Sequence, residues 1–215
     1  MKKTTILLVR HGESMGNVLG LFTGHSGYPL SDLGHTQAAR TATYILENYQ
    51  VDAVYSSDLP RAFQTAEHTA KAFHLPVITH AGLREINAGD WENCLFKDLL
   101  PLYPDSFPLW HDDFLNAYCV GGETVREVSE RGVKALYEIA EANSGKCIVV
   151  ASHATTIRGA LWKISGAPES AMRDMQYSAN CGISELVFAD GKLQIVSMNY
   201  AEHLAELQTK LPSNL

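Results

Sequence analysis

Three short apolar runs alternate with longer stretches of mixed polar and apolar residues along this chain. The first run covers residues 4–9, is rich in leucine and β-branched residues, and ends at Arg10. The second and third cover residues 51–55 and 147–151, and serines follow both. Short apolar runs bounded by polar residues are typical of buried strands in a parallel sheet. The pattern therefore predicts three central strands.

Helix signals follow each predicted strand. Ser31 can cap a helix whose apolar positions recur at helical spacing as far as residue 49. Pro60 suits the first turn of the next helix. The segment Thr124–Glu127 forms a capping box before a third helix, and residues 154–164 continue the pattern after the last strand. Strands and helices are thus expected to alternate.

A β-hairpin is predicted near the C-terminus, where residues 183–188 and 193–198 flank the turn dipeptide Asp190–Gly191. The whole pattern predicts an α/β fold, a three-layer α/β/α sandwich with a mostly parallel sheet and an antiparallel edge. Residues from about 86 to 122 break the alternation, because they are rich in aromatic residues and prolines. We expect one domain over residues 1–215, with 86–122 as an insertion or cap over one end of the sheet.

Charge and composition narrow the classes of function. Seventeen Lys and Arg against 24 Asp and Glu give a net charge of −7, which argues against nucleic acid or an anionic membrane as a partner. The four cysteines lie singly, without the close pairs of a zinc or redox motif. The apolar run after Lys3 is too short for an export signal, and no run approaches a membrane span. We therefore expect a cytoplasmic protein.

Basic and imidazole side chains follow the ends of all three predicted strands. Arg10, His11 and Asn17 follow the first strand, Arg61 the second and His153 the third. Ligands bind beyond the carboxyl ends of the strands in open α/β sheets, so these side chains are expected to meet at one edge. Bringing two imidazoles and two guanidiniums together is costly unless an anion joins them, and guanidinium groups match phosphate oxygens. The pattern predicts a phosphate site.

Five ordered groups of motifs cover nearly the whole chain and strengthen this interpretation. They are Leu7–Ser14 with Asn17, Pro29–Ser31 with Gly34 and Gln37, Ser56–Ala62 with Gln64–Ala66, Leu83–Glu85 with Gly89, Trp91 and Glu92, and Gly121–Glu123 followed by Val150–His153. In this order they resemble the histidine phosphatases, also called the phosphoglycerate mutase-like superfamily, in its RHG phosphatase branch. The resemblance implies the phosphoglycerate mutase-like fold.

The resemblance also implies catalytic roles. His11 would attack phosphorus as a neutral imidazole and form a phosphohistidine intermediate. Arg10, Arg61 and His153 would hold the phosphoryl oxygens and stabilise the charge of the transition state. Glu85 would be the general acid that protonates the leaving oxygen and later activates water.

Neutral contacts to the substrate are implied for Asn17 and for the loop containing Thr23 and Gly24. Ala154 stands at a substrate-binding position where the family usually has glycine, and Asn93 replaces another usual glycine. The methyl group of Ala154 would restrict how closely backbone approaches phosphate. No metal and no cofactor are implied, since arginines supply the positive charge.

Several of these residues also have a purely structural interpretation. His11 and His153 could be strand-end histidines satisfied by backbone groups. Glu85 could pair with its neighbour Arg84 at the surface. The aromatic residues of the insertion are expected to pack against one another rather than to stack on a ligand.

The choice between phosphatase and mutase depends on the part of the pocket beyond the transferred phosphoryl group. A mutase must hold a second anion there, but residues 86–123 contain seven acidic residues and one basic residue, Lys97. We therefore expect a histidine acid phosphatase-type phosphoric monoester hydrolase for small esters with a neutral, apolar or cationic leaving group. The alternatives are a cofactor-dependent phosphoglycerate mutase and a non-catalytic module that binds phosphorylated ligands. The sequence permits a homodimer without requiring one.

Overall fold

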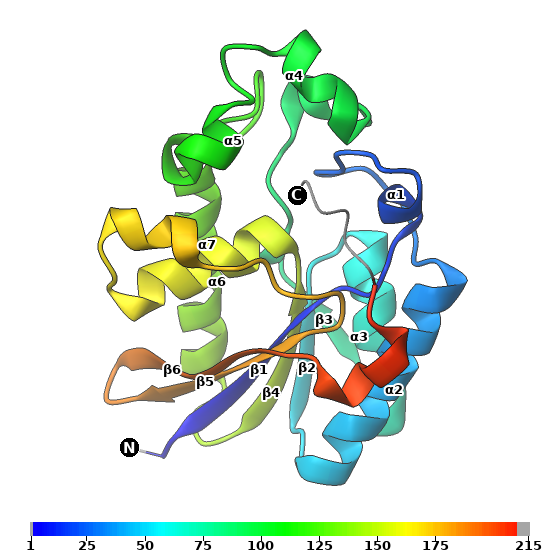
Figure 1. Cartoon of the computed structure of the whole chain (residues 1–215). Coiled ribbons are helices and arrows are strands. Elements are labelled where there is room, and N and C mark those ends of the chain that lie inside the picture. The colour runs from blue at the N-terminus through cyan, green and yellow to red at the C-terminus, as the bar shows by residue number, and fades with distance from the viewer. Residues whose placement is uncertain (1, 210–215) are drawn as a thin grey trace.

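A six-stranded sheet forms the centre of the computed structural model, which describes residues 2–209 (Figure 1). Its strands are β1 (Thr4–Arg10), β2 (Ala53–Ser56), β3 (Val77–Thr79), β4 (Cys147–Ser152), β5 (Ile183–Ala189) and β6 (Lys192–Tyr200). Their order is β3-β2-β4-β1-β5-β6; the first four strands are parallel, and β5 and β6 are antiparallel. The mostly parallel sheet with an antiparallel edge is confirmed.

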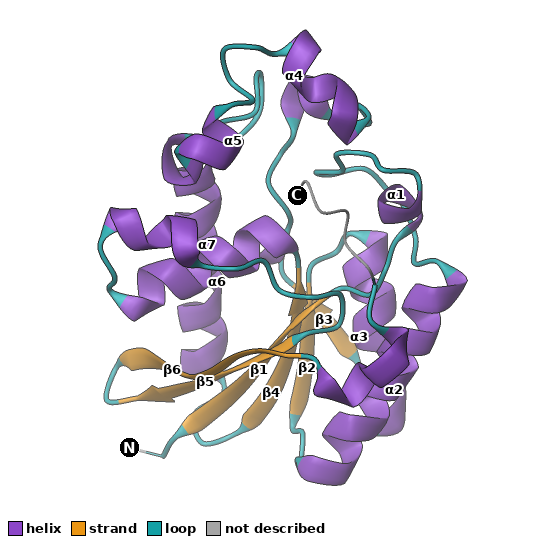
Figure 2. Cartoon of the chain, in the orientation of Figure 1, coloured by secondary structure: helices purple, strands orange, loops and turns teal. Residues whose placement is uncertain are grey.

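Helices cover both faces of this sheet (Figure 2). The longer helices are α2 (Asp32–Asn48), α3 (Pro60–Ala72), α6 (Val125–Ala142) and α7 (Ala154–Ser165). Along β1, Ile6 and Leu8 pack with residues of α6 and α7, whereas Leu7 and Val9 pack with residues of α2 and α3. Side chains of a strand alternate between faces, so one apolar run supplies two cores. The predicted three layers are confirmed.

The residues predicted to start helices and to form the hairpin turn have these roles in the structure. The Ser31 hydroxyl accepts a hydrogen bond from the Gly34 amide at the start of α2, and Thr124 and Glu127 form the capping box of α6. Pro60 occupies the first turn of α3. Between β5 and β6, Asp190 and Gly191 have φ angles of 51° and 74°, as a tight hairpin turn requires.

Residues 86–122, here called the cap segment, lie beyond the carboxyl ends of the parallel strands (Figure 1). Two short helices, α4 (Leu99–Leu102) and α5 (Leu109–Asp112), and several 3-10 turns make up most of it. Its aromatic side chains form their own core: the ring centroids of Trp91 and Trp110 lie 5.8 Å apart, and those of Trp110 and Phe114 lie 4.9 Å apart. The expected packing role of these rings is confirmed.

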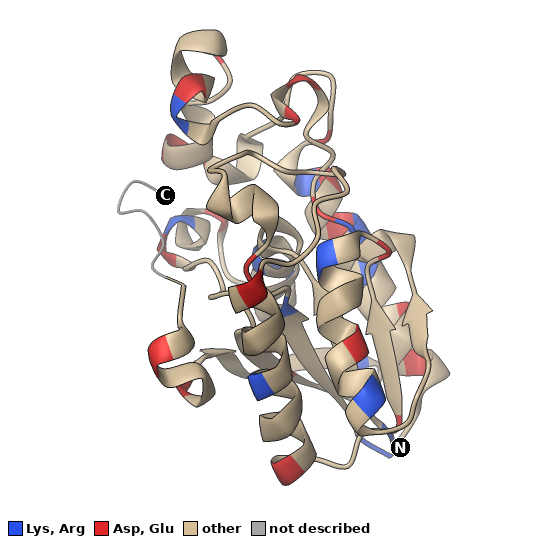
Figure 3. Ribbon diagram, turned by 90° about the vertical axis from the view of Figure 1, so that its right-hand side faces the viewer, with Lys and Arg blue, Asp and Glu red and all other residues tan. Residues whose placement is uncertain are grey.

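The structure also shows where the charged residues and the cysteines lie. Figure 3 shows acidic and basic residues interspersed along the helices of the face that it displays. All four cysteines are free, and Cys119 and Cys181 are buried. Within residues 2–209, no helix is both long and apolar enough to cross a membrane, and no three His, Cys, Asp or Glu side chains are grouped as metal ligands.

The loop after β1 packs backbone to backbone against the first turn of α2. A Cβ atom on Gly34 would lie 1.9 Å from the carbonyl oxygen of Glu13, and one on Gly12 would lie 2.6 Å from the carbonyl oxygen of Gly34. Glu13 O already accepts a hydrogen bond from the Ser31 amide at 2.9 Å. This contact fixes the path of the chain next to His11, and it leaves no room for a side chain.

We expect Gly34→Ala to destabilise the protein by about 1–3 kcal/mol, because the new methyl group must displace backbone. Urea unfolding followed by circular dichroism measures the change. Gly27→Ala is the matched control: a Cβ on Gly27 meets nothing within 4 Å, so this variant should stay within about 1 kcal/mol of wild type. Equal stability of the two variants would contradict the proposed close contact.

Candidate active site

The carboxyl ends of β1 and β4 bring two histidines together. Arg10 pairs with Ser152 in the parallel ladder, and the His11 amide donates to the Ser152 carbonyl at 3.0 Å. The rings of His11 and His153 then lie with their centroids 5.2 Å apart. Both residues are buried. The predicted meeting of strand-end side chains is therefore present in the structure.

The His11 imidazole is held in the state that a nucleophile requires. Its Nδ1 lies 2.7 Å from the Gly12 carbonyl oxygen and donates to it, which leaves Nε2 free. Burial lowers the pKa of His11 well below its usual value, and the nearby charges of Arg61 and Arg10 lower it further. The ring is therefore neutral at physiological pH, with an available lone pair on Nε2.

Two buried guanidinium groups flank these histidines, and backbone carbonyls hold both. Arg10 Nη1 donates to Ser178 O at 2.5 Å. Arg61 donates from Nη1 to Ser26 O at 3.1 Å and from Nη2 to the carbonyls of Thr23 and Gly24 at 3.2 and 2.9 Å. Burial lowers the pKa of Arg61 to about 10, so it keeps its charge at neutral pH. The carbonyls orient these cations without neutralising them.

Unused hydrogen-bonding atoms gather around the His11 ring. Within residues 2–209, Arg10 Nε, Arg61 Nε and both ring nitrogens of His153 are buried without a hydrogen-bond partner. Each buried, unsatisfied donor costs about 1–3 kcal/mol, so such a concentration is unusual. Fixed donors that surround a neutral nucleophile can bind the oxygens of a phosphoryl group and stabilise charge that develops on it.

The loop of residues 23–26 links Arg61 to a carboxylate behind the site. Glu92 accepts hydrogen bonds from the amides of Gly24, His25 and Ser26 at 2.9, 3.0 and 3.0 Å. The carbonyls of the same loop accept from Arg61. The Gly24 amide is therefore already used inside the protein. The loop also packs closely, because a Cβ on Gly24 would lie only 2.4 Å from Ile86 O.

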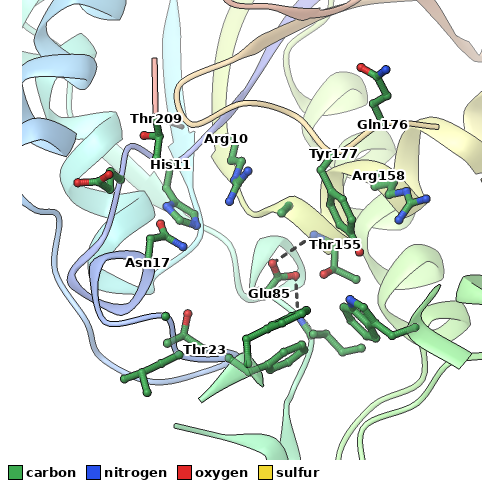
Figure 4. A pocket seen from close by; sticks show the side chains of 18 of the residues that line it. Arg10, His11, Asn17, Thr23, Glu85, Thr155, Arg158, Gln176, Tyr177 and Thr209 are labelled. Carbon is green, nitrogen blue, oxygen red and sulfur yellow. Dashed lines mark hydrogen bonds between the residues drawn. The ribbon is translucent and has the colours of Figure 1, made fainter. Parts of the chain in front are cut away.

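Asn17 reaches the site from the short helix α1 (Met15–Val18). Its side-chain oxygen accepts from the amide and hydroxyl of Ser14 at 3.0 and 3.1 Å. Within residues 2–209 its side-chain NH₂ group makes no hydrogen bond. Asn17 and Thr23 both border the cavity described below (Figure 4).

Glu85 lies at the N-terminus of α7, where backbone amides hold its carboxyl group (Figure 4). The amides of Ile86, Thr155 and Thr156 donate to it at 2.9, 3.2 and 3.3 Å. The structure excludes the alternative surface pairing with Arg84, because Arg84 pairs with Asp58 and Glu85 is buried. Three fixed bonds aim the carboxyl group into the cavity.

Arg131 on α6 holds the segment that carries Glu85. It donates from Nη1 to the carbonyls of Gly82 and Arg84 at 3.1 and 2.6 Å, and from Nη2 to the Glu85 carbonyl at 2.6 Å. It also forms a two-point ion pair with Glu123 at 2.7 and 2.8 Å. Sequence reasoning missed Arg131, although its helix begins directly after the Gly121–Glu123 motif.

A cavity of about 960 Å³ opens in front of these groups. The predicted site residues on its surface are Arg10, His11, Asn17, Thr23, Glu85 and Ala154. Arg61, His153 and Gly24 are buried and are not among the residues that line it. The cap segment adds Leu95–Lys97 and Trp110 to the far wall.

Two further arginines line this cavity, and the sequence analysis did not anticipate them. Arg158 comes from α7, one turn after Ala154, and Arg173 from the 3-10 helix Glu169–Asp174. Lys97 is the single basic residue of the segment 86–123, whereas both arginines lie outside it. Basic residues from three segments border the cavity, so the reason for expecting a neutral, apolar or cationic leaving group does not hold. Arg158 lies four residues after Ala154 on the same helix, and residues at this spacing share one helix face. This spacing could have predicted that Arg158 also faces the site.

The two departures from the usual glycines are compatible with the backbone. Ala154 is the first residue of α7 and does not have a positive φ angle, so it needs no glycine. Asn93 has a φ of 66°, and asparagine tolerates this left-handed conformation better than most residues do. Its amide donates to Phe22 O at 3.0 Å. Both residues therefore adopt backbone conformations that their side chains allow.

Comparisons with known proteins agree with this geometry. A family model described as "Histidine phosphatase superfamily (branch 1)" matches residues 6–201. The chain is 30% identical to the uncharacterized phosphatase PhoE of Bacillus subtilis, over 94% of this chain and 97% of that protein. It is 29% identical to phosphoserine phosphatase 1 of Hydrogenobacter thermophilus, over 94% of both. The crystal structure of a phosphoserine phosphatase from Entamoeba histolytica, in complex with 3-phosphoglyceric acid, superposes with a TM-score of 0.82 at 28% identity, covering 94% of this chain and 99% of that one.

The buried histidines predict a loss of stability in acid. The pKa values of His11 and His153 are lowered in the folded protein, whereas an unfolded histidine titrates near about 6.5. As pH falls below that value, the unfolded chain binds protons that the folded chain does not, so stability decreases. One such histidine accounts for about 1.4 kcal/mol between pH 7.5 and 5.5.

Urea unfolding at these two pH values measures this loss. His153→Gln should lose about 1 kcal/mol less than wild type between them. The exposed His74, replaced by Asn to suit its φ of 56°, is the control and should leave the loss unchanged. An equal loss in wild type and His153→Gln would show that His153 does not carry it.

Proposed function

Since the chain belongs to the histidine phosphatase superfamily, we propose that it is a metal-independent phosphomonoesterase that hydrolyses small phosphate esters through a phosphohistidine intermediate on His11. The observation that carries this proposal is the group of buried polar atoms near the neutral His11 imidazole that have no hydrogen-bond partner within residues 2–209. An approaching phosphoryl group would satisfy these donors. The relatives named as phosphatases, which match along nearly their whole lengths, support the same reaction class.

In the first step, His11 Nε2 attacks phosphorus on the side opposite the ester oxygen. The N–P bond forms while the P–O bond to the leaving group breaks. Arg10, Arg61 and His153 hold the phosphoryl oxygens, and their positive or donor groups stabilise the spreading negative charge. Glu85 transfers its proton to the leaving oxygen, so the product departs as a neutral alcohol.

In the second step, the Glu85 carboxylate takes a proton from a water molecule as that water attacks phosphorus. The N–P bond breaks, inorganic phosphate forms, and the bonding electron pair returns to His11 Nε2. The site thereby returns to its starting protonation state. Backbone amides keep Glu85 in one position for both transfers, and Arg131 holds the carbonyl of the same residue.

We propose that residues 1–215 act as one histidine phosphatase domain, with the cap segment covering the leaving-group side of the cavity. The substrate would be a small phosphate ester, because the cap segment and the strand ends together enclose the cavity. A cofactor-dependent phosphoglycerate mutase is the second candidate. The basic residues Lys97, Arg158 and Arg173 in the cavity favour it, because a mutase needs cations for a second anionic group.

We expect phosphate release from p-nitrophenyl phosphate, in the presence of a chelator, to depend on His11. His11→Ala should lower kcat by at least about 10³-fold, because the covalent route is lost. The exposed-histidine variant His74→Asn serves as the control and should retain wild-type activity.

Incubation with 2- and 3-phosphoglycerate in the same experiment separates the candidates. If bisphosphoglycerate stimulates interconversion of the two phosphoglycerates, the protein is a mutase and the phosphatase proposal is wrong. Absence of turnover on all substrates would favour a binding module.

The role of Glu85 predicts a dependence on the leaving group. p-Nitrophenolate leaves without help, whereas an alkoxide needs a proton, so Glu85→Gln should impair alkyl phosphates about 10²-fold or more and aryl phosphates far less. Arg131→Lys should show the same pattern to a smaller degree, because lysine has three N–H donors for the five hydrogen bonds that Arg131 makes.

Steady-state kinetics on a series of esters with leaving groups of different pKa tests both variants. Arg126→Lys is the matched control on the same helix, since Arg126 is exposed and pairs with Glu169. Equal impairment of alkyl and aryl esters by Glu85→Gln would exclude Glu85 as the general acid.

A further inference from the structure

One peptide group connects the His11 ring to a buried side chain of α2 that the reaction described above does not use. The Gly12 carbonyl, which accepts from His11 Nδ1 at 2.7 Å, and the Glu13 amide belong to the same planar peptide group. The Glu13 amide donates to Gln37 Oε1 at 2.8 Å. Gln37 therefore binds the amide end of the peptide group whose carbonyl end binds the His11 ring.

Contacts on both sides of its side-chain amide fix the orientation of Gln37. The residue is 0% exposed, and Nε2 donates to the Leu207 carbonyl and the Thr209 hydroxyl at 2.7 and 2.8 Å. Two acceptors on this side require the NH₂ group to face them, so the side-chain oxygen faces Glu13. Gln37 does not line the cavity, so its contacts are with the protein and not with a substrate.

The preceding peptide group is held by a different set of residues. The His11 carbonyl accepts from Asn180 Nδ2 at 3.0 Å. The Gly12 amide, at the other end of the same peptide group, donates to Thr65 Oγ1 at 3.0 Å. This peptide group stays fixed when Gln37 is changed, so an effect of Gln37 on the His11 ring must pass through the next peptide group.

We propose that Gln37 is a positioning residue for His11: it fixes the Gly12 carbonyl, which holds the ring proton on Nδ1 and leaves Nε2 free. The hydrogen bond that one ring nitrogen makes decides which tautomer a neutral histidine adopts. Without Gln37, the Gly12 carbonyl could turn away, and a proton on Nε2 would block attack on phosphorus. The bond to Gln37 also polarises the peptide group and strengthens its carbonyl as an acceptor.

The tautomer of His11 in the ligand-free protein tests this inference. Protonated and unprotonated ring nitrogens have different ¹⁵N chemical shifts, and the spectrum of His11→Ala identifies the His11 signals in a protein with labelled histidines. Wild type should show the Nδ1–H tautomer. Gln37→Met keeps the length of the side chain but offers only a weak thioether acceptor, so it should shift the tautomer ratio toward Nε2–H by about 10-fold.

The kinetic part of the inference rests on the proposed function. Gln37→Met should lower kcat/KM for p-nitrophenyl phosphate by about 10-fold, because this constant includes the attack by His11. Inhibition by inorganic phosphate needs no attack, so its inhibition constant should stay close to that of wild type. A merely structural loss at Gln37 would weaken phosphate binding as well.

Two further variants separate the contacts of this side chain. Gln37→Glu keeps an oxygen that accepts from the Glu13 amide, but it cannot donate to both acceptors that Nε2 serves, so it should keep the wild-type tautomer. Gln64→Met is the matched control, because Gln64 Oε1 accepts from the Leu30 amide at the same 2.8 Å and neither residue lines the cavity. This control should leave the tautomer and kcat/KM unchanged. Melting curves establish that each variant is folded.

The outcomes separate the inference from the proposed function. An unchanged His11 tautomer in Gln37→Met, or an equal loss of kcat/KM in Gln37→Met and Gln64→Met, would overturn the positioning role. A tautomer in Gln37→Glu that matches that of Gln37→Met would also overturn it, because the contacts with residues 207 and 209 would then be responsible. A tautomer shift in a protein without phosphatase activity would support the inference and overturn the proposed function, and a shift together with the kinetic loss would support both.

Discussion

The cost of burying positive charge is the constraint on which this structure depends. Arg10 and Arg61 lie beside two neutral imidazoles in a region that solvent barely reaches. Such an arrangement is unfavourable in isolation, and it persists because backbone carbonyls hold each guanidinium while several donors stay unused. In the proposed reaction, an incoming phosphoryl group would bind these unused atoms and offset the cost of the buried charge.

Two carboxylates that lie outside the cavity lining, Glu92 and Glu123, support this site from behind. Glu92 holds the amides of the loop whose carbonyls hold Arg61, and Glu123 pairs with Arg131, which holds the carbonyl of Glu85. Glu92 therefore orients Arg61 through the loop between them, and Glu123 orients Glu85 through Arg131. This arrangement explains how a protein with a net charge of −7 can present a cationic cavity to an anionic ester.

The sequence predicted the parts of the fold that local signals determine. The apolar run before Arg10, the Ser31 cap and the Asp190–Gly191 turn each depend on residues that are close together in the sequence, and each formed as expected. The strand β3 and the short helix α1 escaped prediction, because elements of three or four residues have too little periodicity to be recognised. Their conformation depends on neighbours that are distant in the sequence.

By itself the sequence determined which polar side chains meet at one edge of the sheet, because parallel strands end at a common edge. Each of these residues lies at or just beyond the carboxyl end of a recognisable strand: Arg10, His11, Arg61 and His153. Only the tertiary structure decided the rest of the site. Arg131 meets the Glu85 carbonyl across 46 residues, and Arg10 meets Ser178 across 168. Arg158 and Tyr177 lie closer in sequence, but the Arg158 guanidinium packs over both Tyr177 and Phe114, and its contact with Phe114 depends on how the cap segment packs. Local periodicity carries no information about such distances, so the leaving-group side of the cavity emerged only when the chain was folded.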